Sequence, residues 1–134
     1  MKWNFSFLEN QKVLAVTVTG QFSLNEQKKM FEEIESFKEE LTAGKILFDN
    51  RQLGMNNVDA EAIKSSVLVV KNFCQKFPDC KIAGLVGNNL LNFGLGRQFE
   101  NYSDIEGDMS FQLFKDENQA LNWLLNRNMD VLNW

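Results

Sequence analysis

Two short apolar segments that lack polar alternation constrain this fold most. One is Lys45-Ile46-Leu47-Phe48-Asp49, and the other spans residues 80–86. A strand with one face in water alternates apolar and polar residues, so continuous runs are typical of strands buried on both faces of a parallel sheet. Parallel neighbours need a long crossover, which is usually a helix. The two segments therefore predict an α/β domain.

A hairpin is expected before the first of these runs. Trp3, Phe5 and Phe7 alternate with polar residues, which is typical of a half-buried strand. Residues 9–11 read as a turn, and residues 13–19 read as a second strand with one apolar face. The first strand is the natural antiparallel edge of the sheet.

Helical patterns lie between and after the strands. A capping box, Ser23-Leu24-Asn25-Glu26, opens a helix whose apolar residues extend to Leu41 and which Gly44 is expected to end. Residues 50–57 read as a polar loop, and a second helix follows at about residues 58–76. A third helix is expected after Gly87, with Leu95 on its apolar stripe.

The last strand and helix complete the order. Alternating residues 109–113 predict a strand, and Asp116 is expected to cap the final helix. The order is then ββαβαβαβα, which requires a mostly parallel sheet packed by helices. We expect residues 1–134 to form a single domain. The segment from residue 126 to 134 is rich in apolar residues; it either folds back on the domain or contacts a second copy of the chain.

Composition restricts the classes of partner and cofactor. The net charge is −4, with 14 Lys and Arg against 18 Asp and Glu, which disfavours nucleic acid. No apolar run is long enough to span a membrane and the N-terminus has no signal-peptide pattern, so a cytoplasmic location is expected. The chain has no histidine, and the spacing of Cys74 and Cys80 matches no common zinc pattern. We expect no metal, no cofactor and two free thiols, with a local disulfide as the alternative.

Two glycines lie close together in the predicted third helix, within Phe93-Gly94-Leu95-Gly96-Arg97. A dinucleotide fingerprint needs a third glycine and a position at the start of a helix, and this segment has neither. Each glycine within a helix costs about 0.5–1 kcal/mol relative to alanine. Close packing of the helix on the sheet is the expected reason, and a pocket beside the helix is the alternative.

Three segments resemble a known family. They are Leu47-Phe48-Asp49 at the end of a strand, the helix Phe93-Gly94-Leu95-Gly96-Arg97-Gln98-Phe99-Glu100, and a closing segment that contains Phe114-Lys115-Asp116 and Ala120-Leu121-Asn122-Trp123-Leu124. Together they resemble the bacterial SpoIIAA-like group of STAS domains, a group whose function is not established, over nearly the whole chain. The resemblance implies a STAS-like fold and a regulatory or protein-interaction role.

The resemblance also implies where this chain differs from anti-sigma-factor antagonists. Those proteins are regulated by phosphorylation of a serine that opens the second helix. The corresponding residues are Asn56-Asn57-Val58-Asp59, which have no hydroxyl group. A phosphate cannot be added there, so partner switching by phosphorylation is not expected. Comparison of the group with Sec14-type lipid carriers suggests a small hydrophobic or lipid-like ligand as the alternative function.

A ligand or partner site is predicted at the carboxyl ends of the parallel strands, where open α/β sheets bind ligands. Polar residues gather there in the predicted topology, namely Asp49, Arg51, Asn57, Asn88, Asn89 and Arg97. The backbone after Gly87 would offer N–H groups to an anion. An exposed ion pair between Arg97 and Glu100 is the simpler interpretation of those two residues.

Catalysis is not expected. Without histidine there is no Ser-His or Cys-His pair. The carboxylates Asp49, Asp59 and Glu61 have the spacing of caps and loops. We therefore expect a non-enzymatic regulatory or interaction domain, with a carrier or sensor of a small hydrophobic ligand as the alternative.

Overall fold

The structure is a computed structural model that describes residues 1–10, 12–37, 39, 44–87, 90–106 and 110–127. Its elements, in chain order, are β1 (Lys2–Leu8), β2 (Val13–Gln21), α1 (Leu24–Glu35), β3 (Lys45–Gly54), α2 (Ala60–Lys76), β4 (Lys81–Leu85), α3 (Leu90–Glu106), β5 (Phe111–Phe114) and α4 (Glu117–Leu124). This order confirms the predicted ββαβαβαβα sequence of elements.

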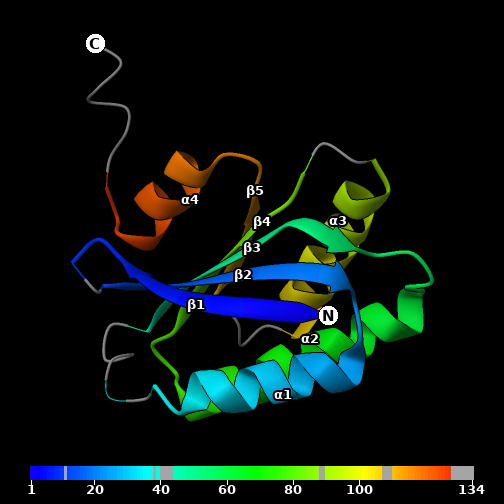
Figure 1. Ribbon diagram of the computed structural model, residues 1–134, viewed down its shortest axis with the longest axis horizontal. Coiled ribbons are helices and arrows are strands. Elements are labelled where there is room, and N and C mark those ends of the chain that lie inside the picture. The colour runs from blue at the N-terminus through cyan, green and yellow to red at the C-terminus, as the bar shows by residue number, and fades with distance from the viewer. Residues whose placement is uncertain (11, 38, 40–43, 88–89, 107–109, 128–134) are drawn as a thin grey trace.

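The strands form one sheet in the order β1-β2-β3-β4-β5. β1 pairs with β2 antiparallel, and each later neighbour is parallel (Figure 1). The mostly parallel sheet with an antiparallel edge strand at the N-terminus is therefore as predicted. Ile46, Leu47 and Phe48 are all buried, because both faces of β3 are covered.

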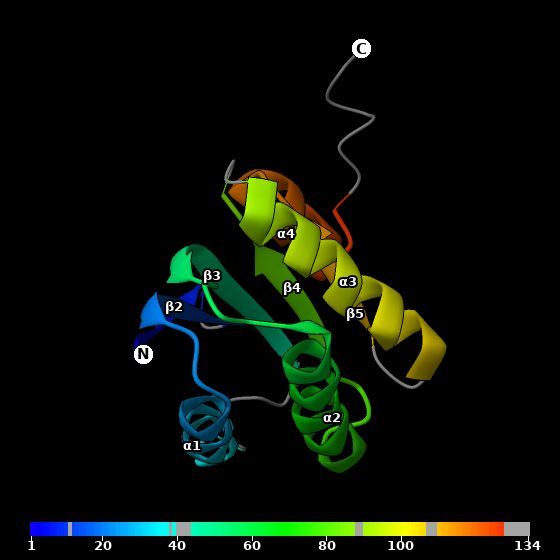
Figure 2. The same cartoon turned by 90° about the vertical axis from the view of Figure 1, so that its right-hand side faces the viewer.

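Helices cover the two faces unequally. α1 and α2 lie side by side beneath the sheet, and α4 lies above it (Figures 1 and 2). The larger apolar core joins α1 and α2 to residues such as Val16, Ile46 and Ile82, and Phe99 of α3 packs against this core. The smaller core joins α4 to Leu47 and Leu85 on the opposite face. The side of the sheet that carries α1, α2 and α3 is thus the thicker one.

Side-chain caps begin three of the helices. Ser23 Oγ accepts a hydrogen bond from the Glu26 amide at 3.4 Å, as the capping box predicts. Asp59 Oδ1 accepts from the Ala62 amide at 2.8 Å, and Asp116 Oδ1 accepts from Asn118 at 2.9 Å. Each cap satisfies one N–H that the first turn leaves without a partner. Asp116 thus caps the final helix as predicted.

Two predicted boundaries were wrong. α1 ends at Glu35, earlier than expected, and Leu41 lies outside the described residues. β3 continues to Gly54 through residues that were read as a loop. The register of β2 and β3 shifts between Thr17 and Thr19, and this irregularity lets pairing resume as far as Gly54. Leu53 is buried as a result.

No helix in the described part of the chain is both long and apolar enough to cross a membrane.

Candidate functional site

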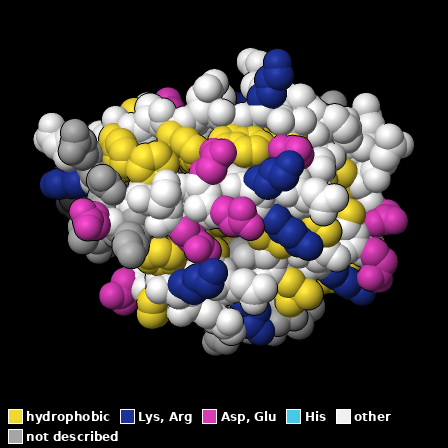
Figure 3. Space-filling model, turned by 60° about the horizontal axis from the view of Figure 1, so that its bottom comes forward, with side chains coloured by type: hydrophobic (Ala, Val, Ile, Leu, Met, Phe, Trp, Pro, Cys, Tyr) yellow, Lys and Arg dark blue, Asp and Glu magenta, His cyan; other side chains and the backbone are white. Residues whose placement is uncertain are grey.

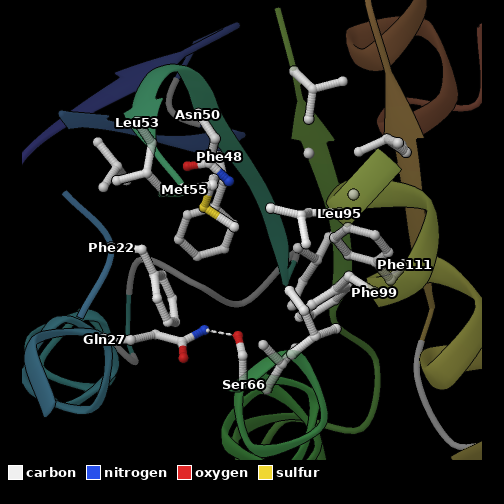
Figure 4. A pocket seen from close by; sticks show the side chains of 18 of the residues that line it. Phe22, Gln27, Phe48, Asn50, Leu53, Met55, Ser66, Leu95, Phe99 and Phe111 are labelled. Carbon is white, nitrogen blue, oxygen red and sulfur yellow. Dashed lines mark hydrogen bonds between the residues drawn. The ribbon is translucent and has the colours of Figure 1, made fainter. Parts of the chain in front are cut away.

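An apolar cavity of about 110 Å³ lies between the sheet and helices α1, α2 and α3. Five aromatic rings line it, from Phe22, Phe31, Phe48, Phe99 and Phe111. Phe22 precedes α1, Phe48 lies on β3, and Phe99 and Phe111 lie on α3 and β5, so the wall combines segments that are distant in sequence (Figure 4).

The cavity is buried at the end formed by α1 and α2, and partly exposed residues line it elsewhere. Gln27 and Ser66 are buried at the end formed by α1 and α2. Phe22, Asn50 and Met55 also line the cavity and are partly exposed. In Figure 4, Asn50 and Met55 lie across the cavity from the Gln27 side chain. Phe99, Phe111 and Leu113 on the α3 and β5 side line the cavity and are partly exposed too.

Gln27 and Ser66 form a polar pair at the buried end. The Gln27 Nε2 donates a hydrogen bond to Ser66 Oγ at 2.8 Å (Figure 4). The Gln27 Oε1 is buried and accepts no hydrogen bond from any described residue. A buried acceptor without a donor costs about 1–3 kcal/mol. Gln27 therefore has one buried acceptor atom whose hydrogen-bonding capacity is unused by the described residues.

Charged side chains do not line the cavity within the described part of the chain. They lie instead on the outer surface. On the face that includes α1 and α2, acidic and basic side chains are interspersed, and they form no patch of a single charge (Figure 3). The ion pair between Lys76 and Glu35, at 3.0 Å, joins α2 to α1. The cavity is thus suited to an uncharged occupant.

The two glycines of α3 have different surroundings. A Cβ on Gly96 would lie 3.1 Å from Leu113 Cδ2 and 3.4 Å from Val86 Cγ1, so the expected close packing holds at this position. A Cβ on Gly94 would meet nothing within 4 Å, so close packing does not explain that glycine. Gly96 also lines the cavity, together with the buried Leu95.

Asp49 and Arg51, which were predicted to belong to a site, form an ion pair. Arg51 donates from Nε and Nη2 to the two Asp49 carboxylate oxygens at 2.8 and 2.7 Å. The hydrogen bond from Arg51 lowers the pKa of Asp49 below its usual value, against the opposing effect of burial. Both residues border a depression that also includes Thr17, Val18 and Gln52, and neither lines the apolar cavity.

Arg97 and Asn57, two other predicted site residues, do not line the cavity. Arg97 is exposed and pairs with Glu100 at 2.8 Å, as the simpler interpretation had it. The second oxygen of Glu100 accepts from the Leu113 amide at 2.8 Å, which ties α3 to β5. Asn57 adopts a positive φ of 67° in the connection before α2. Asn88 and Asn89 lie outside the described residues. The six-residue site stays a prediction.

Sequence reasoning missed Gln27, Ser66 and Asn50. A signal was present for the first two, because each occupies a position on the apolar stripe of its helix. Gln27 lies in line with the buried Met30, and Ser66 lies in line with the buried Ile63. A polar residue at such a position must find a partner in the interior.

Cys74 and Cys80 are buried free thiols with their Sγ atoms 3.4 Å apart. The hydrogen bond with Cys74 and burial raise the pKa of the Cys80 thiol. The described residues include no group of three or more Cys, Asp or Glu side chains placed to hold a metal ion.

Comparison with known proteins shows the fold. The chain is similar to the anti-sigma factor antagonist SpoIIAA in its unphosphorylated form, with a TM-score of 0.61, 10% identity, and coverage of 93% of this chain and 97% of that one. It is also similar to an uncharacterized protein of the DUF3478 family from Shewanella loihica PV-4 with a SpoIIAA-like fold, with a TM-score of 0.54, 18% identity and 92% of each chain covered. No family model and no curated protein matches the sequence. The chain therefore has a SpoIIAA-like, STAS-like fold, as the sequence motifs predicted.

Proposed function

We propose that this protein is a non-enzymatic regulatory domain that binds a small apolar molecule in the cavity between the sheet and helices α1, α2 and α3. The observation that carries the proposal is the cavity itself, of about 110 Å³ and lined mainly by aromatic and aliphatic side chains. Apolar pockets with a few polar groups are the usual form of small-molecule sites.

The size of the cavity favours a small ligand over a long lipid chain. An apolar cavity of about 150 Å³ holds one benzene molecule. This cavity, at about 110 Å³, is smaller, so a single ring or a short branched chain would fill it and further atoms would extend past its partly exposed lining. Of the two ligand types raised by the sequence, a small hydrophobic molecule is therefore preferred to a membrane lipid.

A ligand in this cavity is placed to alter the surface of the domain. The wall includes Phe22, which joins β2 to α1, and Met55, which joins β3 to α2. The similar protein SpoIIAA is described as an antagonist of an anti-sigma factor, which is a protein–protein function. Residues 56–59 have no hydroxyl group to phosphorylate. We propose that occupancy of the cavity takes the place of phosphorylation and regulates contact with a protein partner.

Binding can be tested with 4-fluorotoluene as the probe and fluorine NMR as the measurement. We expect saturable binding to the purified protein, with a rise in melting temperature because the ligand binds only the folded state. Leu95→Trp places an indole in the cavity and should abolish binding. Leu68→Trp makes the same change at a position that is 48% exposed, so binding should persist. If the wild-type protein does not bind the probe, or if both variants bind it equally, the cavity is not the site.

A further inference from the structure

We propose that β1 is a surface through which two copies of this chain associate, by antiparallel pairing of β1 with β1 across a two-fold axis at Phe5. The pairing joins the five-stranded sheets of the two copies into one continuous sheet. The residues that line the cavity include none from β1. The inference therefore goes beyond the proposed function and does not rest on it.

The outer edge of β1 is unprotected. In the described part of the chain β2 is its only strand neighbour, so the backbone groups on its other side face away from the sheet. Proteins usually protect such edges with short strands, prolines, bulges or charged side chains. β1 has seven residues, contains no proline, keeps an unbroken register with β2, and has Lys2 as its single charged residue. The strand therefore has little that opposes the addition of another strand.

The opposite edge of the sheet is protected in two ways. β5 has only four residues, so it offers little length for pairing. The Glu100 carboxylate of α3 also accepts a hydrogen bond from the Leu113 amide at 2.8 Å, so a side chain already uses a backbone donor of this edge strand. Of the two edges, β1 is therefore the one that is open to pairing.

An aromatic row lies along β1 on the face that carries α1. Trp3, Phe5 and Phe7 pack against the larger core and are still partly exposed. Phe37 makes edge contacts with Phe5 and Phe7, with ring centroids 5.2 and 5.8 Å apart. Trp3 Nε1 donates a hydrogen bond to Glu33 at 2.6 Å, which fixes the indole. Hydrophobic side chains form a row on this side of the molecule (Figure 3). Partly exposed apolar side chains that gather in this way are typical of association surfaces.

The sequence of β1 is complementary to itself when the strand is reversed. The antiparallel register that pairs all seven residues places Phe5 opposite Phe5, Trp3 opposite Phe7, and Asn4 opposite Ser6. Residues that are directly opposite lie on the same face, so the aromatic side chains of the two copies join into one row. Asn4 and Ser6, which are exposed, meet on the other face.

The charges at the two ends of β1 favour a second copy as the partner. Lys2 begins the strand, Glu9 follows its last residue, and both are exposed. Antiparallel pairing places Lys2 opposite Leu8 of the other copy and next to its Glu9, so opposite charges meet at both ends of the interface. Parallel pairing in register would instead place Lys2 beside Lys2. A surface that is complementary to itself across a two-fold axis is the form of a symmetric dimer.

The oligomeric state of the purified protein tests this interface. In sedimentation equilibrium over a wide range of protein concentrations, we expect a reversible equilibrium between monomer and dimer. Hydrogen–deuterium exchange provides a second measurement. Protection of the β1 amides should rise with protein concentration, because the second copy supplies hydrogen-bond partners for the outer edge.

Paired charge substitutions locate the contact. Asn4→Lys combined with Ser6→Lys places like charges opposite each other twice across the interface and should weaken dimerisation about tenfold. Asn4→Lys combined with Ser6→Glu changes the same positions but places opposite charges there, so the dimer should persist. Asn72→Lys combined with Gln75→Lys adds two lysines at exposed positions on α2 and should leave dimerisation unchanged.

Weaker association of the like-charge variant alone supports the inference. A wild-type protein that is monomeric at every concentration overturns it, and so do like-charge and opposite-charge variants that dimerise equally well. If the β1 amides are protected to the same degree at all concentrations, a segment of the same chain covers the edge and the inference also fails. The exchange measurement on wild type decides the question if the like-charge variant does not fold. None of these results depends on ligand binding in the cavity.

Discussion

Asp49 and Arg51 lie two residues apart on one strand, so both side chains project on the same side of the sheet. That spacing allows two hydrogen bonds between the guanidinium and the carboxylate. The Arg51 amide also donates to Asp49 Oδ1 at 3.2 Å. Because these hydrogen bonds are made within the pair, the two side chains have less capacity to bind a ligand. Their structural role is therefore the easier one to measure.

Replacing Asp49 by Asn should lower stability in a pH-dependent manner. The pKa of Asp49 is lower in the folded state than its ordinary value of 3.8, so the ionised carboxylate stabilises the folded state above that pH. The stabilisation is lost as pH falls through the folded-state pKa. Because both side chains are partly exposed, we expect a loss of only about 0.5–1 kcal/mol at pH 7.

Urea unfolding at pH 7 and at the lowest pH where the protein stays folded measures this change. The difference between wild type and Asp49→Asn should shrink at low pH. Asp79→Asn, at an exposed position before β4, serves as the control and should show a smaller difference. A difference that is the same at both pH values would contradict the assignment.

The two thiols should react slowly in the folded protein. Cys74 and Cys80 are 6% and 4% exposed, and the pKa of Cys80 is raised by its hydrogen bond with Cys74 and by burial. Only the thiolate attacks a disulfide reagent, so burial slows both thiols and the raised pKa slows Cys80 further. After complete reduction, the native protein should react with an aromatic disulfide reagent at least tenfold more slowly at pH 8 than the protein in urea. Equal rates would show that the region opens readily.

At the scale of the elements, α3 contains the most unusual sequence. Gly94 and Gly96 both weaken the helix, yet only Gly96 has neighbours that a side chain would crowd. Leu113 and Val86, the neighbours of Gly96, lie on or next to the strands that α3 covers. The sequence alone made the two glycines equivalent, because helical periodicity does not give the distance between a helix and a sheet.

Alanine substitutions should separate the two glycines. Gly94→Ala should raise the free energy of unfolding by about 0.5–1 kcal/mol, since the methyl group meets nothing and the unfolded chain loses freedom. Gly96→Ala should give no gain or a loss, because its methyl group would press on Leu113 at 3.1–3.2 Å. Chemical denaturation of the two variants and wild type provides the measurement. Equal gains from both substitutions would contradict the close packing of Gly96.

The sequence predicted the order and type of the elements because each has a local signal. Apolar runs marked β3 and β4, and Ser23 and Asp116 marked helix starts that the structure confirms. It did not predict the full length of β3, because that depends on a register shift against β2. A local polar run cannot reveal a pairing made by a distant strand.

The cavity was harder to predict for a similar reason. Gln27 and Ser66 are 39 residues apart, and their hydrogen bond exists only because α1 and α2 pack side by side. The expectation that ligands bind at the carboxyl ends of parallel strands led to Asp49 and Arg51. The residue between them, Asn50, is the one that lines the cavity. Alternation along a strand sends neighbouring side chains to opposite faces. That expectation therefore gave the correct end of β3, but it did not give the face of the sheet on which the cavity lies.

At the scale of the whole molecule, the sheet separates two cores of different size. The α4 side is a small core in which Leu124 and Ala120 are fully buried. The other side has three helices and the cavity, with Leu53 in its wall. Filling a space between a sheet and three helices requires side chains from many segments, and here they leave a void. We infer that α4 stabilises the sheet and that the opposite side binds the ligand.

Matched leucine substitutions test this division. Leu124→Ala and Leu53→Ala remove the same atoms from opposite sides of the sheet, and each should destabilise the protein by about 2–5 kcal/mol. Only Leu53→Ala enlarges the ligand cavity, so only this variant should shift the binding preference from 4-fluorotoluene towards a larger homologue such as 1-fluoro-4-propylbenzene. Leu124→Ala should bind both probes as wild type does, at a temperature where it remains folded. A shift in ligand size preference caused by Leu124→Ala would show that the two cores are coupled, and the division of roles across the sheet would then be wrong.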